Sequence, residues 1–184
     1  MVELIVSMAI MLIVGAAMMT FFAFCIRQYQ ASNEEVNLQY ESQLCWSRMQ
    51  EAILAADRGI SVSTDTMNLY SSDETTGALK RTELYLDTTN DTIQYQEYTL
   101  TEDASTWKQE GAAQCFASYI TGFTPKLMDE KGHEIDSSTN ITDKPTKVEV
   151  MFSYALGEKT YETTNVVALR NHNVLATDQI ILLK

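Results

Sequence analysis

The residue in this chain whose type and position most clearly indicate chemistry is a single carboxylate. Glu3 stands at the head of residues 4–26, a stretch without any charged side chain. At the start of a helix the dipole favours a carboxylate by about 0.3–1 kcal/mol, and that role needs no partner. In apolar surroundings an unpaired charge costs several kcal/mol, so Glu3 packed among apolar helices would need a cation from a neighbouring molecule. The residues alone leave both roles open.

Catalytic groups are not indicated elsewhere in the sequence. The chain contains none of the patterns GxSxG, HExxH, GxxxxGK[ST] or GxGxxG, which mark common nucleophile, zinc, phosphate and dinucleotide sites. Asp87, Asn90 and Asp91 carry the oxygen ligands that calcium prefers, but the EF-hand pattern is absent and a solvated turn is the expected structure. We therefore expect a protein that is not an enzyme and that binds no cofactor.

The cysteines and histidines do not predict a metal site. Cys45 and Cys115 lie in the polar part of the chain and could form a disulfide if that part is outside the cell, although spacing alone cannot establish the bond. Cys25 falls in the apolar stretch and is expected to behave as a small hydrophobic residue. No cysteine pair has CxxC spacing, and His133 and His172 are isolated from each other and from the cysteines, so zinc is not expected.

The charge of the chain argues against one large class of partners. The formal net charge is −12, and almost all of the acidic residues follow residue 30. No stripe of Lys and Arg is present, whereas phosphate binding requires clustered cations, so no direct nucleic-acid partner is expected. The acidic excess is the ordinary condition of a domain that self-repulsion keeps soluble.

Residues 4–26 predict a membrane-spanning helix, and the first domain is placed at 1–26. As a helix these residues would extend about 34 Å, enough for the ~30 Å hydrocarbon layer. Arg27 and Tyr29 follow and suit the membrane interface. A signal peptide would carry a basic start and a shorter apolar core, and a domain this small has too little protein to bury such a helix. The large apolar side chains of the expected membrane helix include Leu4, Ile5, Val6, Ile10, Leu12, Ile13, Val14, Phe21 and Phe22.

Residues 27–58 predict a helical stem that continues the membrane helix. No proline or glycine interrupts the chain from Gln28 to Ala56, and strong helix formers dominate. Apolar residues recur mostly at three- and four-residue steps, which gives the stem one face to pack, on a sheet rather than in a coiled coil. Gly59 is expected to cap the end of the helix. The apolar face consists of Leu38, Cys45, Met49, Ala52, Ile53 and Ala56, widened by Leu44 and Trp46.

Residues 59–184 predict a β-rich head, because the periodicity changes from helical to alternating after the stem. The clearest half-buried strand is 148–154, and 161–169 is its expected antiparallel partner across a turn at 157–159. A helix followed by six or seven mostly antiparallel strands defines an α+β fold, in which the long N-terminal helix packs on a mostly antiparallel β-sheet.

Other segments of the head are less regular. Runs 83–86 and 92–98 predict a hairpin whose loop is 87–91, and 116–127 predicts one strand or two short ones around Gly122. Two further segments have no assigned role, the polar insertion 129–147 and the apolar tail 180–183.

The N-terminal stretch VELIVSMAIMLIVG resembles the start of type IV pilins and type II secretion pseudopilins. In that family a peptidase cuts after a glycine, and the next residues are typically Phe-Thr-Leu-Val-Glu-Leu, followed by an apolar helix. Val2, Glu3 and Leu4 match the end of this run, and Met1 stands where the family has its first leucine. The sequence VVALRN at 166–171 is also similar to the last strand of larger minor pseudopilins, a weaker signal over six residues.

This resemblance implies an assembly role for Glu3. In the family the glutamate pairs with the methylated N-terminal amine of a neighbouring subunit, which would supply the cation that burial demands. The resemblance also implies a basic leader and a glycine cleavage site for a prepilin peptidase upstream of Met1, so we expect the mature chain to start two residues before Met1. The implied partners are other pilin or pseudopilin subunits and the membrane.

The expected function is that of a minor, low-copy pilin-like subunit of a type IV pilus, a competence pseudopilus or a type II secretion pseudopilus. Its expected location is a single pass through the cell membrane with an extracytoplasmic head, at the cell surface or in the periplasm after assembly. The alternative is a signal-anchored extracytoplasmic binding or sensor module, in which the helix only tethers the head. The sequence does not distinguish a pilus from protein secretion or DNA uptake.

Overall fold

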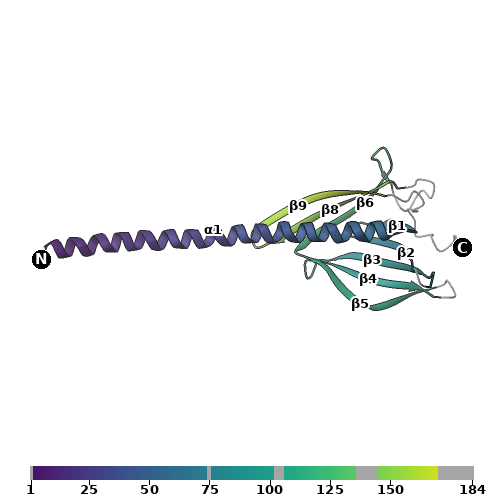
Figure 1. The fold of residues 1–184 in the computed structure, drawn as a ribbon, viewed down its shortest axis with the longest axis horizontal. Coiled ribbons are helices and arrows are strands. Elements are labelled where there is room, and N and C mark those ends of the chain that lie inside the picture. Colours follow the sequence, from purple (N-terminus) through teal and green to yellow (C-terminus); the bar gives the residue numbers. More distant parts are fainter. Residues whose placement is uncertain (1, 74–75, 102–105, 136–144, 170–184) are drawn as a thin grey trace.

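One long helix and nine strands make up the part of the chain that the computed structural model describes, residues 2–73, 76–101, 106–135 and 145–169. The helix comes first in the chain and the strands follow, all paired antiparallel in two sheets (Figure 1). The predicted α+β class, with a long N-terminal helix packed on antiparallel β-structure, is confirmed, and the strands divide between two sheets.

Helix α1 runs without interruption from Val2 to Ala55, about 81 Å at 1.5 Å per residue. Its end differs from the prediction. The Ala56 amide donates to the Ile53 carbonyl at 3.3 Å, and the Arg58 amide donates to Tyr70 of the first sheet at 3.1 Å. Gly59 opens a strand and has no positive φ, so the predicted glycine cap is wrong. The first bond closes the last turn of the helix and the second joins the chain to β2, so the chain passes directly from the helix into the sheet.

The first sheet is a five-stranded meander in the order β1-β2-β3-β4-β5. Its strands are β1 (Gly59–Val62), β2 (Thr66–Ser72), β3 (Leu79–Asp87), β4 (Thr92–Leu100) and β5 (Trp107–Ser118). The predicted hairpin between β3 and β4 is confirmed. In its turn the Asp87 carboxylate accepts hydrogen bonds from the Thr89 amide at 3.0 Å and from Asn90 Nδ2 at 2.7 Å, and these bonds lower the Asp87 pKa. The Asp87 carboxylate, one of the groups considered for calcium, therefore serves the turn itself.

The second sheet has four strands in the order β7-β6-β8-β9. They are β6 (Ile120–Met128), β7 (Glu134–Ile135), β8 (Lys147–Leu156) and β9 (Lys159–Ala168). The predicted pairing of 148–154 with 161–169 is confirmed, with Phe152 opposite Thr163 and Gly157 at φ 61° in the turn. The chain passes from the first sheet to the second at Tyr119, where φ is 63°, and Gly122 lies inside β6.

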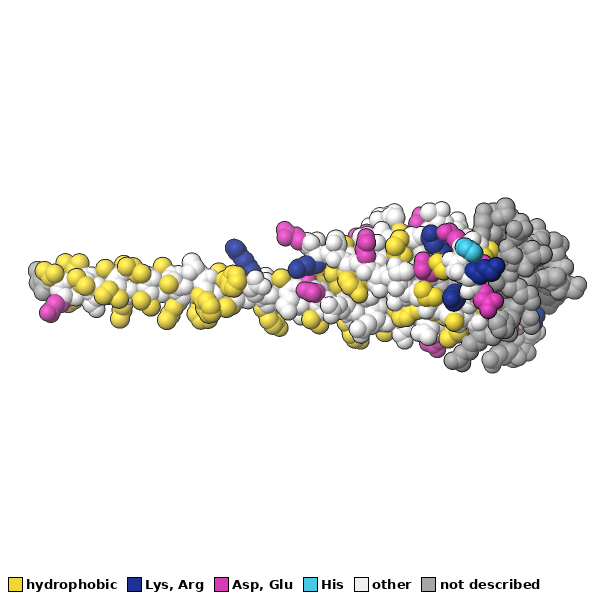
Figure 2. Space-filling view, turned by 90° about the horizontal axis from the view of Figure 1, so that it is seen from above, with side chains coloured by type: hydrophobic (Ala, Val, Ile, Leu, Met, Phe, Trp, Pro, Cys, Tyr) yellow, Lys and Arg dark blue, Asp and Glu magenta, His cyan; other side chains and the backbone are white. Residues whose placement is uncertain are grey.

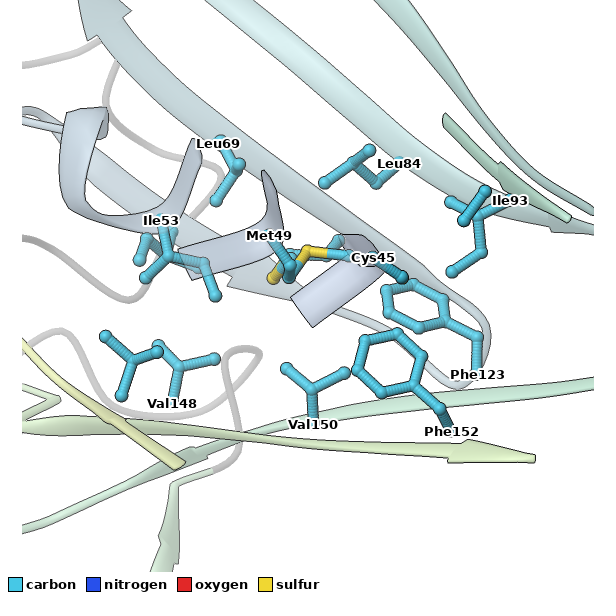
Figure 3. Packing of buried hydrophobic residues seen from close by; sticks show 14 of the residues in the cluster. Cys45, Met49, Ile53, Leu69, Leu84, Ile93, Phe123, Val148, Val150 and Phe152 are labelled. Carbon is cyan, nitrogen blue, oxygen red and sulfur yellow. The ribbon is translucent and has the colours of Figure 1, made fainter. Parts of the chain in front are cut away.

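The second half of α1 lies between the two sheets, which diverge around it (Figure 1). Cys45, Met49 and Ile53 project from the helix, with side chains of the first sheet on one side and of the second sheet on the other (Figure 3). The residues facing them include Leu69, Leu84 and Ile93 from the first sheet and Val148, Val150 and Phe152 from the second. The predicted apolar face of the stem therefore packs against both sheets and forms one core with them.

Several predicted segments fall partly or wholly outside the described residues. Strand β7 lies within the insertion predicted at 129–147, of which 136–144 is not described. His172, the tail at 180–183 and the last two residues of the VVALRN match also lie outside the described part.

Candidate assembly surface

The N-terminal half of α1 extends away from the head and no other described element covers it (Figure 1). Apolar side chains cover most of the visible face of this part of the helix (Figure 2). Leu4 is 66% exposed, Leu12 74% and Phe22 61%. The helix is long and apolar enough to cross a membrane, and none of its most apolar window is buried in the head. The other predicted membrane residues, Ile5, Val6, Ile10, Ile13, Val14 and Phe21, are exposed as well.

The head first reaches the helix at Glu34. The turn between β8 and β9 lies against this residue, because a Cβ added to Gly157 would be 3.2 Å from Glu34 Oε2. Leu38 is the first residue of α1 to be buried. Residues 2–33 therefore extend roughly 48 Å beyond the head, which exceeds the ~30 Å of a hydrocarbon layer by roughly 18 Å. Part of the uncovered helix would stand outside a membrane.

Glu3 lies in the first turn of α1, and its side chain is exposed. Among the described residues it forms no ion pair. The first cation along the helix is Arg27, and 24 residues at 1.5 Å each place it roughly 36 Å away. At that distance, beyond three Debye lengths in physiological salt, no useful attraction remains. A cation that neutralises Glu3 in an apolar setting must therefore come from outside the described part of the chain.

A second exposed apolar stripe continues along the stem, and the sequence analysis missed it. Tyr29 is 74% exposed, Val36 57%, Tyr40 63% and Leu54 42%. At about 100° per residue these side chains lie roughly opposite Cys45, on the side of α1 away from the core. The signal was present in the spacing, because Phe22, Tyr29 and Val36 recur every seven residues. We call Tyr29, Val36, Tyr40 and Leu54 the stem stripe.

The two cysteines considered for a disulfide are both free thiols. Cys45 is buried in the core between the sheets, and burial raises its pKa to about 11. Cys115 is exposed on β5, with its sulfur 3.7 Å from Ser118 Oγ. The register pairs Cys115 with Gln94, which points away from the core because its neighbour Ile93 is buried. The two thiols thus lie on different sides of the first sheet, and no Cys45–Cys115 bond is formed in this structure.

The described residues contain no group of three or more His, Cys, Asp or Glu side chains that could hold a metal ion. In the β3–β4 turn the Asp87 carboxylate accepts hydrogen bonds from Thr89 and Asn90.

Comparison with known proteins does not place the chain in a family. No protein-family model matches it, and no curated protein matches it. The architecture is nevertheless pilin-like, because a long apolar N-terminal helix precedes antiparallel sheets and packs its second half against them. This likeness concerns topology alone.

Proposed function

We propose that this chain is a minor pilin-like subunit that assembles into a filament of the type IV pilus, competence or type II secretion kind. The observation that carries the proposal is the uncovered apolar half of α1, with one carboxylate in its first turn and no described cation within reach. The role is structural, without catalysis or a cofactor. The partners are other subunits of the same kind.

In the proposed mechanism, apolar halves of α1 from neighbouring subunits pack together and exclude water. Packing would remove Glu3 from solvent, where a lone charge is costly, and so selects an arrangement that brings a cation to it. The N-terminal amine of a neighbour, implied by the family resemblance, is such a cation. At 4 Å and an effective dielectric of 20, the attraction is about 4 kcal/mol. Because only one register satisfies the pair, Glu3 would also set the axial position of the subunit.

Before assembly, the same helix would hold the subunit in the cell membrane with the acidic head outside the cytoplasm. A prepilin peptidase would act upstream of Met1 in the precursor. The stem beyond the membrane would then already expose Tyr29, Val36 and Tyr40 for contact with other subunits.

The alternative function is a tethered extracytoplasmic binding or sensor module. A tether would need apolar surface only across the membrane, and Glu3 would be an ordinary interfacial charge. The stem stripe favours assembly over this alternative, because large apolar side chains remain exposed well beyond the length that a membrane covers.

Replacing Glu3 tests the proposal. We expect Glu3→Gln to remain in the membrane fraction but to be lost from sheared filaments, since the amide is similar in shape and lacks the charge. Glu35→Gln, an exposed carboxylate on the same helix, is the matched control and should assemble normally. Normal incorporation of Glu3→Gln, or its failure to insert into the membrane, would contradict the proposed role of the charge.

A further inference from the structure

The face of the first sheet turned away from α1, here called the outer face, carries buried polar groups where solvated side chains are expected. Gln96 is 3% exposed and Tyr70 is 4% exposed, although the core lies on the opposite face. Strand register places two rows of side chains side by side on this face: Tyr70, Arg81, Tyr98 and Gln109 in one row, and Asn68, Glu83 and Gln96 in the other.

An irregularity in β5 makes the outer face concave. The step from Tyr95 to Glu97 on β4 faces the longer step from Gln114 to Glu110 on β5, so β5 carries extra residues there. Gly111, at φ 73°, provides the positive φ that this bend uses. The carbonyls of Glu110 and Gly111, at this irregularity, accept hydrogen bonds from the amide of Gln96.

The amide of Gln96 is fixed at the base of this concavity. Its Nε2 donates to the carbonyls of Glu110 at 3.0 Å and Gly111 at 3.4 Å, and its Oε1 accepts from Gln109 Nε2 at 3.0 Å. The resulting hollow has a volume of about 340 Å³. We call it the outer hollow; its lining residues are Glu83, Tyr85, Gln96, Tyr98, Gln109 and Ala113.

Aromatic rings and a neutralised ion pair border the outer hollow. The Arg81 guanidinium lies 4.2 Å from the centroid of the Tyr98 ring and 5.1 Å from that of Trp107. Trp107 also packs on Tyr70 at 6.0 Å between centroids. Arg81 Nη2 is 3.8 Å from Glu83 Oε2, so the one cation and the one anion in contact here balance each other. The site offers aromatic surface and hydrogen-bonding groups, and its one charged lining residue, Glu83, is paired with Arg81.

This arrangement costs stability that a plain solvated sheet face would not lose. Asn68 Oδ1 and Arg81 Nε are buried on this face without a hydrogen-bond partner among the described residues. Each unpaired buried group costs about 1–3 kcal/mol. Departures of this kind from stable packing are typical of functional sites rather than of faces that only cover a core.

We propose that the outer hollow binds a neutral sugar ring of a glycan. Its volume falls in the range of about 300–1,000 Å³ that small-ligand sites occupy. Amide and phenol groups can donate to and accept from sugar hydroxyls, and the Glu83 carboxylate can accept from them, while tyrosine rings offer flat apolar surface to the C–H face of a pyranose. A negatively charged glycan is disfavoured, because Glu83 is the one charged residue of the lining and the chain carries a net charge of −12. This binding does not depend on filament assembly.

Titration of the full chain with cellotetraose and with chitotetraose tests the proposal, in a detergent that has no sugar headgroup. A Trp46→Phe background leaves Trp107 as the single tryptophan, so its fluorescence reports on the border of the outer hollow. We expect a saturable fluorescence change with at least one tetrasaccharide at millimolar concentration or below. Calorimetry with the unsubstituted chain should give the same affinity.

Two variants locate the binding. Gln109→Ala removes a hydrogen-bonding group of the lining and should weaken binding about fivefold or more. Lys108→Ala alters the adjacent exposed residue, which points to the other face of β5, and should leave the affinity unchanged. The proposal would be overturned by no saturable change with either tetrasaccharide at about 10 mM. It would also be overturned by equal affinities of the two variants, or by binding that requires a sulfated sugar.

Discussion

Replacing Met49 with alanine tests whether α1 is an integral layer of the head. Met49 is completely buried, and its side chain lies between Leu69 and Leu84 of one sheet and Val150 of the other (Figure 3). Truncating a buried methionine typically costs 2–5 kcal/mol, from lost burial and from the cavity that remains. Met49 packs against side chains of both sheets, so a shift of one sheet would not fill the cavity. We expect the free energy of unfolding to fall by about 3–4 kcal/mol.

Urea unfolding of the full chain in detergent micelles measures this loss. Trp46 packs against the core one turn away and reports on its integrity through fluorescence. With a slope of about 1–3 kcal/mol per molar urea, the midpoint should fall by about 1–4 M. Gln50→Ala, at the neighbouring exposed position, should change stability by less than about 0.5 kcal/mol. Equal midpoints for the two variants would refute the conclusion that the helix holds the sheets together.

Two further predictions concern the core thiol and the stem stripe. Burial raises the pKa of Cys45 from 9.0 to about 11, so between these pH values the folded state keeps a proton that the unfolded state loses. The contribution of Cys45 to the free energy of unfolding should be complete below about pH 9 and fall by up to about 3 kcal/mol toward pH 11. Cys45→Ala should reduce this fall in urea unfolding but not abolish it, because burial also raises the pKa of Tyr154. The same loss of stability with pH in Cys45→Ala as in the unsubstituted chain would contradict the assignment. Val36→Asp should reduce filament yield without lowering stability, whereas Gln39→Ala, on another face of α1, should not; normal filaments from Val36→Asp would exclude the stem stripe from assembly.

The helix and the main hairpins could be predicted because their signals are local. Residues 4–26 are uncharged, and the three- and four-residue spacing of Cys45, Met49 and Ile53 marks one face of a helix. Alternation along β8 likewise identified a half-buried strand, and Gly157 identified its turn. Glu3 was recognisable for the same reason, since one charge before an apolar stretch is visible without any knowledge of tertiary contacts.

The division into two sheets and the outer hollow could not be predicted from such signals. The boundary between β5 and β6 lies at Tyr119, whose positive φ is uncommon for a tyrosine. The nearby Gly122 suggested a strand boundary that does not occur, because Gly122 lies inside β6. The burial of Gln96 depends on extra residues in β5 and therefore on the pairing register of two strands. Alternation in the sequence specifies which side chains share a face, but it does not specify when a face curves.

Because α1 runs without interruption, the helix and the head are expected to move as one stiff body. The helix contains no proline and one glycine, Gly15, and the head is locked onto its far end through the shared core. A tilt of about 10° at the base would carry the other end of an 81 Å rod sideways by about 14 Å. A small change of angle at the N-terminal end of the helix would therefore produce a large displacement of the head.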